Sequence, residues 1–83
     1  MKLAWSSRAW NDYVHWQQTD KRKLKRINLL IKETMRDPID GIGNPELLKH
    51  DLQGFWSRRI DKEHRLVYSV DQNEILIVAC RYH

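Results

Sequence analysis

Apolar residues recur every three to four positions over the first half of the chain, which predicts two consecutive helices after a short strand. The segment Lys2–Trp5 reads as that strand, and either of the two serines that follow it is suited to cap the first helix. The second helix, from Lys21 to about Arg36, combines one apolar face with one basic face. Almost nothing separates the two helices, so we expect an antiparallel helical hairpin.

Each predicted helix carries an apolar stripe. In the first helix, Trp10, Tyr13 and Val14 fall at helical spacing, and side chains with this spacing usually belong to a core. Trp16 lies off that stripe, and we expect it to pack on the second helix. The stripe of the second helix consists of Leu24, Ile27, Ile31 and Met35.

A loop follows the helices. The segment Asp37–Pro45 contains both prolines and two of the three glycines, and Pro38 ends the second helix. This loop is too short to link two domains, so residues 1–83 are predicted to form a single domain.

The second half of the chain changes to a strand-like pattern. The runs Phe55–Ile60 and His64–Val70 are apolar and aromatic, and the polar residues between them predict a β-hairpin. After a turn at Asp71–Asn73, the run Glu74–Arg81 forms a third strand, whose unbroken apolar stretch is typical of a central or doubly covered position.

These elements predict an α+β fold in the order β-α-α-β-β-β. The sheet is expected to be antiparallel, with the helix hairpin packed on one of its faces. The other face would then remain open as a concave surface.

The predicted hairpin places two arginines together. With an assumed loop of three residues, Arg59 lies across from Arg65 and Trp56 lies across from Tyr68. Side chains alternate along a strand, so the arginines share one sheet face and the aromatic pair the other. Two neighbouring guanidinium groups indicate a phosphate site, because each presents a planar fork of donors. The alternative, that both are simply solvated on an open face, is equally compatible with the composition.

Charge favours an anionic partner. The 83 residues have a formal net charge of +4, which is typical of proteins that bind nucleic acids or acidic proteins. The basic face of the second helix is either solvated or follows an RNA backbone. The longest apolar run, Ile75–Cys80, is too short to cross a bilayer, and no apolar leader is present. We therefore expect a soluble, cytoplasmic protein without contact to a membrane.

Cys80 is the only cysteine, so no internal disulfide can form and a reducing compartment is the default. Its apolar surroundings in the sequence predict a small buried side chain. With His83 it makes a CxxH pair, but no second pair accompanies it, and neither His50 nor His64 has a partner. We predict no metal site and no cofactor, and we interpret His50 and His64 as surface or supporting residues.

The remaining polar residues suit RNA cleavage by attack of the 2′-hydroxyl. That reaction needs a base at the 2′-oxygen, cations around the phosphorane and an acid at the departing 5′-oxygen. Simpler roles also fit: capping for Glu46, solvated charge for the lysine and a frayed end for the histidine. The candidates are Glu46, Lys49, Arg59, Arg65 and His83.

Several stretches resemble a known family. The runs KRINLLIKET, PELLKH, GFWSRRI, EHRLVYSV and the ending ACRYH are similar to the YoeB toxins of the RelE/ParE superfamily, and the similarity covers essentially the whole chain. The resemblance implies a RelE-like fold, related in layout to microbial ribonucleases. It also implies a metal-free, ribosome-dependent endoribonuclease that cuts translated mRNA in the 30S A site and inhibits translation. The partner would be a YefM-type antitoxin with an acidic, partly disordered C-terminal segment, and pairing into a homodimer is a further option.

Residue roles follow from this resemblance. Glu46 would be the general base, Arg65 the phosphate stabiliser and His83 the general acid, with Lys49 and Arg59 as supporting cations. Members of the family usually have a tyrosine after the histidine at which this sequence ends. Either the sequence lacks this last residue of the protein, or this member works without it. If the tyrosine is absent from the protein, we expect cleavage to be weaker than in a form with the tyrosine restored.

Two other functions remain open from the sequence. The first is a toxin of the same fold that acts by binding its target without cleavage, in the manner of gyrase poisons. The second is a basic RNA-binding module, which predicts salt-sensitive affinity for RNA without cleavage.

Overall fold

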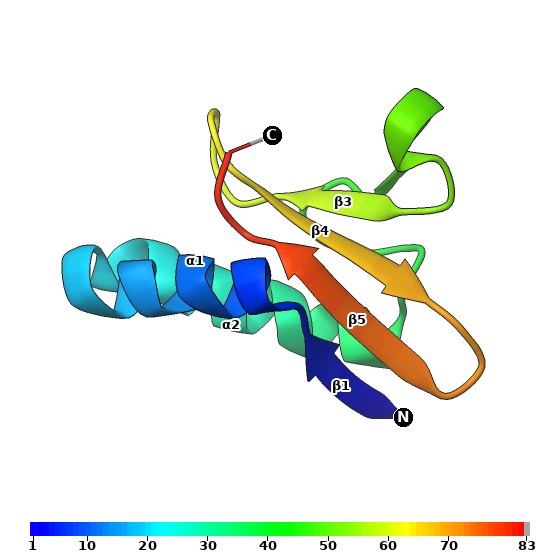
Figure 1. Cartoon of the computed structure of the whole chain (residues 1–83), viewed down its shortest axis with the longest axis horizontal. Helices are drawn as coiled ribbons and strands as arrows, with labels where there is room; N and C mark the ends of the chain where they lie inside the picture. Colours follow the sequence, from blue (N-terminus) through cyan, green and yellow to red (C-terminus); the bar gives the residue numbers. More distant parts are fainter. Residues whose placement is uncertain (83) are drawn as a thin grey trace.

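Two helices lie against one face of a five-stranded sheet (Figure 1). The computed structural model describes residues 1–82. Its elements are β1 (Lys2–Trp5), α1 (Ser7–Thr19), α2 (Lys21–Arg36), β2 (Glu46–Leu47), the short 3₁₀ turn η1 (His50–Leu52), β3 (Trp56–Arg59), β4 (Arg65–Val70) and β5 (Glu74–Ala79). The predicted α+β class is confirmed.

The sheet is mixed rather than wholly antiparallel. Its strand order is β1-β5-β4-β3-β2, and the predicted antiparallel arrangement holds for β3, β4 and β5. β1, however, pairs with β5 in parallel, from Lys2 opposite Glu74 to Trp5 opposite Ile77. Parallel neighbours require a long crossover, and the helices and other strands between β1 and β5 supply it. The additional strand β2 forms at the far edge, within the segment between α2 and β3.

The helical hairpin forms as expected, with a single residue between its helices. Ser6 begins α1, and its Oγ accepts a hydrogen bond from the backbone N–H of Ala9. Asp20 ends α1 and caps α2, because its carboxylate accepts hydrogen bonds from the N–H groups of Arg22 and Lys23. These hydrogen bonds satisfy backbone donors that a helix cannot pair internally.

The predicted core stripe of α1 was wrong for Trp10, whereas Tyr13 is partly buried against the core. Trp16 is buried, at 5% exposure, whereas Trp10 is 49% exposed. The indole N–H of Trp16 donates to the backbone oxygen of Cys80, so the chain after β5 determines which face of α1 is covered. Trp10 instead packs edge-on against Trp5, at a distance of 5.7 Å between ring centroids.

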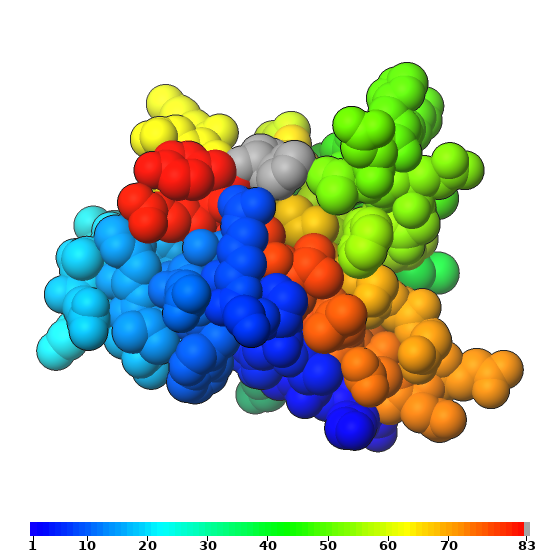
Figure 2. All heavy atoms as spheres, in the orientation of Figure 1, coloured from blue at the N-terminus to red at the C-terminus, as the bar shows by residue number. Residues whose placement is uncertain are grey.

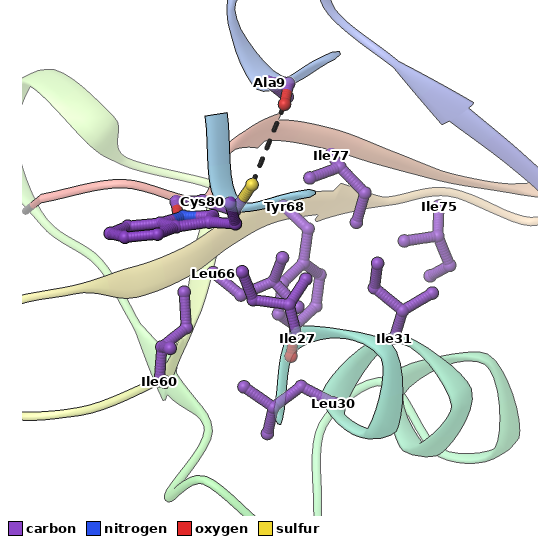
Figure 3. Close-up of a cluster of buried hydrophobic side chains, with 11 residues drawn as sticks. Ala9, Ile27, Leu30, Ile31, Ile60, Leu66, Tyr68, Ile75, Ile77 and Cys80 are labelled. Carbon is purple, nitrogen blue, oxygen red and sulfur yellow. Dashed lines mark hydrogen bonds between the residues drawn. The ribbon is translucent and has the colours of Figure 1, made fainter. Parts of the chain in front are cut away.

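The core lies between α2 and the central strands (Figure 3). Ile27 and Ile31 of α2 are buried as the pattern predicted, and Leu30, which flanks that stripe, is fully buried too. Cys80 is buried too, which confirms its prediction, and burial together with the nearby Asp12 raises the pKa of its thiol to about 12. The remaining members of the cluster are Ala9, Trp16, Ile60, Leu66, Tyr68, Ile75 and Ile77.

A buried arginine organises the loop between α2 and β2. Arg58 of β3 is fully buried, and its guanidinium donates to the backbone oxygens of Asp37, Asp40 and Ile42 and to the hydroxyl of Tyr68. The loop is therefore folded around this side chain, and it leads directly into the strand that carries Glu46.

Gly43 brings the same loop close to the core. Its backbone has φ +81°, and a Cβ atom there would lie 2.7 Å from a methyl group of Leu30. Only glycine fits so close an approach in this conformation. Its backbone oxygen accepts a hydrogen bond of 2.7 Å from the N–H of Arg59, which fixes the loop against β3. Across residues 1–82, neither helix has the length and apolar character needed to cross a bilayer.

Candidate functional site

The β3–β4 hairpin has the predicted register. Arg59 is paired with Arg65, and Trp56 is paired with Tyr68. The backbone N–H of Ile60 donates to the oxygen of His64, which closes a loop of three residues. Tyr68 is buried on the face covered by the helices, so the two arginines lie on the opposite face, which we call the open face.

Glu46 and Arg65 come together on the open face. The Oε2 atom of Glu46 lies 3.8 Å from Nη1 of Arg65, and the same Nη1 donates to the hydroxyl of Ser57 over 3.1 Å. Glu46 in β2 is directly opposite Ser57 in β3, so the sheet register itself produces this row. The Glu46 side chain is 56% exposed and that of Arg65 is 26% exposed, so both are accessible to a ligand.

Arg59 adds a second cation beside this pair. It is exposed and borders a hollow of about 440 Å³ between α2 and the β3–β4 loop. The Nη2 atom of Arg26 in α2 donates to the backbone oxygen of Arg59 over 3.2 Å, which ties the helix to this edge of the hollow. The lining residues are Arg26, Arg59, Ile60, Asp61, Lys62 and Arg65. Four of these six side chains are cationic, so the hollow is suited to an anion.

Lys49 makes no polar contact with the Glu46–Arg65 pair within the described residues. It is exposed and directly precedes the turn η1, three positions after Glu46. Within residues 1–82 it has no hydrogen bond or ion pair with the other predicted site residues. In Figure 1 the turn η1 stands clear of the sheet beside β3.

His83, the predicted general acid, lies outside the described residues. The segment that leads to it is described, and it runs beside the start of β4. The backbone N–H of Arg65 donates to the oxygen of Tyr82 over 3.0 Å. The residue next to His83 is therefore joined to the residue whose guanidinium contacts Glu46.

Hydrogen bonds to side chains fix residues 80–82, which we call the tail. The N–H of Cys80 donates to the carboxylate of Asp12 in α1, and Arg8 donates to the backbone oxygen of Arg81. The N–H of Tyr82 donates to Nδ1 of His64 over 2.7 Å. Figure 2 shows the tail, in red, lying over the blue residues of α1.

The β3–β4 loop is fixed by Asp61. Its carboxylate accepts hydrogen bonds from the N–H groups of Glu63 and His64 and lies 2.7 Å from the ammonium group of Lys23. Burial opposes the charged form, but the hydrogen bonds and Lys23 together lower the pKa of Asp61 to about 2. Lys23 is therefore engaged in a structural ion pair rather than in a solvated basic face.

Sequence reasoning missed two residues that shape the site and left the role of a third open. Ser57 is two residues before Arg59 on the same strand, so the alternation of side chains already predicted that both lie on the same sheet face. Arg58 has the parity of Trp56, which places it on the helix-covered face. His64 was interpreted as a surface or supporting residue, and its burial is a matter of tertiary contacts that no local pattern encodes. Within residues 1–82, no cluster of three His, Cys, Asp or Glu side chains has the arrangement of a metal site.

Comparison with known proteins gives consistent matches over the whole chain. Residues 5–83 match the family model described as YoeB-like toxin of bacterial type II toxin–antitoxin system. Toxin YoeB of Escherichia coli K12 is 63% identical over 83 residues, which cover 100% of this chain and 99% of that protein.

Solved structures agree with this match. A YoeB/ParE toxin from Agrobacterium tumefaciens is 47% identical, with a TM-score of 0.96 over 100% of this chain and 99% of that one. YoeB of Staphylococcus aureus, solved as a dimer, is 49% identical with a TM-score of 0.93, and its heterotetrameric complex with YefM gives 49% and 0.92. Both Staphylococcus matches cover 100% of this chain and 97% of the other.

Proposed function

The chain belongs to the family of YoeB-like toxins of bacterial type II toxin–antitoxin systems, and we propose that it is a ribosome-dependent endoribonuclease that cleaves translated mRNA in the A site. The observation that carries this proposal is the pairing of Glu46 with Arg65 on an open, cationic sheet face. A carboxylate beside a guanidinium supplies a proton acceptor and a phosphate ligand within one hydrogen-bonded row.

The proposed reaction is attack of a 2′-hydroxyl on the adjacent phosphate. Glu46 takes the proton of the 2′-hydroxyl as its oxygen bonds to phosphorus, and Arg65 neutralises the charge that develops on the phosphorane. The bond from phosphorus to the 5′-oxygen breaks, and His83 donates a proton to that oxygen. The products are a 2′,3′-cyclic phosphate and a 5′-hydroxyl, and side chains alone transfer the protons.

Ser57 and Arg59 complete the cationic part of the scheme. Ser57 accepts a hydrogen bond from Arg65 and thus restricts the direction of its guanidinium. Arg59, directly across from Arg65, supports binding of the phosphate backbone, with Lys49 as a further cation near the turn η1. The hollow beside Arg59 would accommodate a flanking phosphate.

Cleavage on programmed ribosomes tests the proposal. The protein should produce discrete A-site cuts in a translated message, detected by primer extension, with cyclic phosphate ends. Glu46→Gln and Arg65→Ala should each lower the cleavage rate by about 10²-fold or more. Matched controls are Glu74→Gln at the start of β5 and Arg36→Ala at the end of α2, which should cleave normally. Intact RNA with wild-type protein would contradict a nuclease function, and intact RNA together with DNA damage in cells would favour the binding-only toxin.

We also propose that the partner is an antitoxin of the YefM type, because the Staphylococcus relative has been solved with YefM. An acidic, disordered segment would order itself on the cationic open face and cover Arg59 and Arg65. Its affinity should fall as salt concentration rises, which titration calorimetry at several salt concentrations would measure; an affinity independent of salt would contradict this.

Self-association is proposed on the same basis, since that relative also forms a dimer. Light scattering during size-exclusion chromatography would give the mass in solution, and a monomer at all concentrations would contradict it. Action on translating ribosomes would place the protein in the cytoplasm.

A further inference from the structure

Of the three histidines that the structure describes, His64 alone is buried, at 6% exposure. Its ring packs edge-on against Trp16, at 4.8 Å between centroids, and lies 5.2 Å from the ring of Tyr82. The imidazole therefore lies between α1 and the tail, at the position where β4 begins.

The imidazole of His64 makes a hydrogen bond, and this bond depends on which ring nitrogen carries the proton. Its Nδ1 accepts from the backbone N–H of Tyr82 over 2.7 Å. An accepting nitrogen needs a free lone pair, so His64 must be neutral, with its proton on Nε2. The next residue, Arg65, donates its own backbone N–H to the oxygen of Tyr82. His64 and Arg65, at the start of β4, thus engage both backbone polar groups of Tyr82.

Tyr82 adopts a backbone conformation that needs such support. Its φ angle is +66°, in the left-handed region that residues other than glycine seldom occupy. The tail is already attached at Cys80 through Asp12 and Trp16, so the fold does not depend on the hydrogen bonds at Tyr82 to keep this segment in place. Their particular effect is to hold Tyr82 beside Arg65 at the start of β4.

We propose that His64 is a positioning residue for RNA cleavage, which acts by accepting the Tyr82 N–H and so holding the tail, which leads to the proposed general acid, beside Arg65. This inference rests on the proposed nuclease function. A misplaced acid would slow proton transfer to the leaving oxygen without weakening the binding of RNA, because Arg59 and Arg65 stay in place. A displacement of about 1 Å can lower a rate by up to 10²-fold.

Three variants separate the hydrogen bond from the packing. His64→Phe keeps a ring between Trp16 and Tyr82 but removes the acceptor. His64→Asn loses the ring but retains an acceptor oxygen at a comparable distance from the backbone. The control is His15→Phe, because His15 packs edge-on against the same Trp16 at 4.7 Å and has no hydrogen bond to the tail within the described residues.

Two measurements are needed for each variant. Amide hydrogen exchange followed by NMR compares the N–H of Tyr82 with that of Cys80, which serves as an internal reference because it is bonded to Asp12. Single-turnover cleavage on programmed ribosomes, at a series of protein concentrations, gives the maximal rate and the half-saturating concentration separately.

We expect His64→Phe to lower the maximal rate about 10- to 100-fold with a nearly constant half-saturating concentration, and to speed exchange at Tyr82 but not at Cys80. His64→Asn should recover a large part of the rate, and His15→Phe should behave as wild type. Fast exchange at Tyr82 with a normal rate in His64→Phe would overturn the positioning role, as would unchanged exchange at Tyr82. A wild-type protein that cleaves no RNA would instead refute the nuclease function, while the exchange data would still decide whether the hydrogen bond exists.

Discussion

Consecutive arginines on β3 face opposite sides of the sheet and have opposite roles. Arg58 points into the helix-covered face, is fully buried and uses its guanidinium on backbone oxygens and the hydroxyl of Tyr68. Arg59 points to the open face, is exposed and lies across from Arg65. The comparison shows that a guanidinium becomes structural when carbonyl groups surround it and remains available to a ligand when they do not.

Tyr68 reinforces the structural side of this comparison. Burial raises the pKa of its hydroxyl, which therefore stays protonated and donates to the backbone oxygen of Pro38 over 2.6 Å. Because Arg58 donates to the same hydroxyl, the two side chains connect β3 and β4 by hydrogen bonds to the loop between α2 and β2. That loop leads into β2, so the helix-covered face indirectly determines where Glu46 lies.

The largest effect is expected from removing the buried arginine. Arg58→Ala should lower the free energy of unfolding by about 3 kcal/mol, because three partly buried loop carbonyl groups and the Tyr68 hydroxyl lose their donor. Urea denaturation followed by tryptophan fluorescence would measure this. Arg36→Ala, which removes an exposed arginine of α2, should change stability by less than about 0.5 kcal/mol. Equal stability of the Arg58 and Arg36 variants would show that Arg58 does not organise the loop.

Arg59→Ala should give the opposite result. The side chain is exposed, so stability should stay within about 0.5 kcal/mol of wild type. The cleavage rate should fall about tenfold, roughly 1.4 kcal/mol, because one phosphate cation is lost while Arg65 remains. Denaturation and single-turnover cleavage on the same preparation would make the comparison. A variant that is destabilised yet fully active would reverse the roles assigned to the two arginines.

Local patterns in the sequence were sufficient for much of this fold. The helical period and the strand alternation act over a few residues, so they predicted both helices and the hairpin. The register, and with it the pairing of Arg59 with Arg65, also needed the assumption of a three-residue loop. They failed where distant segments decide the outcome. Trp16 is buried because the tail meets α1, and Arg58 because three loop carbonyls surround it. β1 pairs with β5, which lies at the other end of the chain.

The candidate site divides in the same way. Arg65 and Arg59 followed from strand parity, but Glu46 lies in a two-residue strand whose pairing no pattern indicated, and family resemblance supplied its role. The place of His83 beside them stays a prediction.

A change in the β3–β4 loop should have an intermediate effect on stability. Asp61→Asn should lower the free energy of unfolding at pH 7 by about 1 kcal/mol, a value reduced for partial solvent exposure. The folded-state pKa of about 2 lies below the ordinary value of 3.8, so the ionised carboxylate stabilises the fold above pH 4, and this contribution is lost as pH falls toward 2. Denaturation curves at several pH values should therefore converge for wild type and variant at the acidic end. A constant difference across this range would contradict the ion pair with Lys23.

The smallest effect is expected at Ser57, which lies on the open face yet is fully buried. Its hydroxyl accepts a hydrogen bond from Arg65. Ser57→Ala should therefore leave the guanidinium of Arg65 free to turn, while its charge and its exposure stay the same. We expect the cleavage rate to fall roughly threefold, about 0.6 kcal/mol, with little change in stability, because a serine hydrogen bond has a modest net contribution. Ser69→Ala, on the adjacent strand β4, is the matched control and should cleave as wild type. If Ser57→Ala matched Arg65→Ala in its loss of activity, Ser57 would have to contact RNA itself; if it had no effect, the pairing with Glu46 alone would orient Arg65.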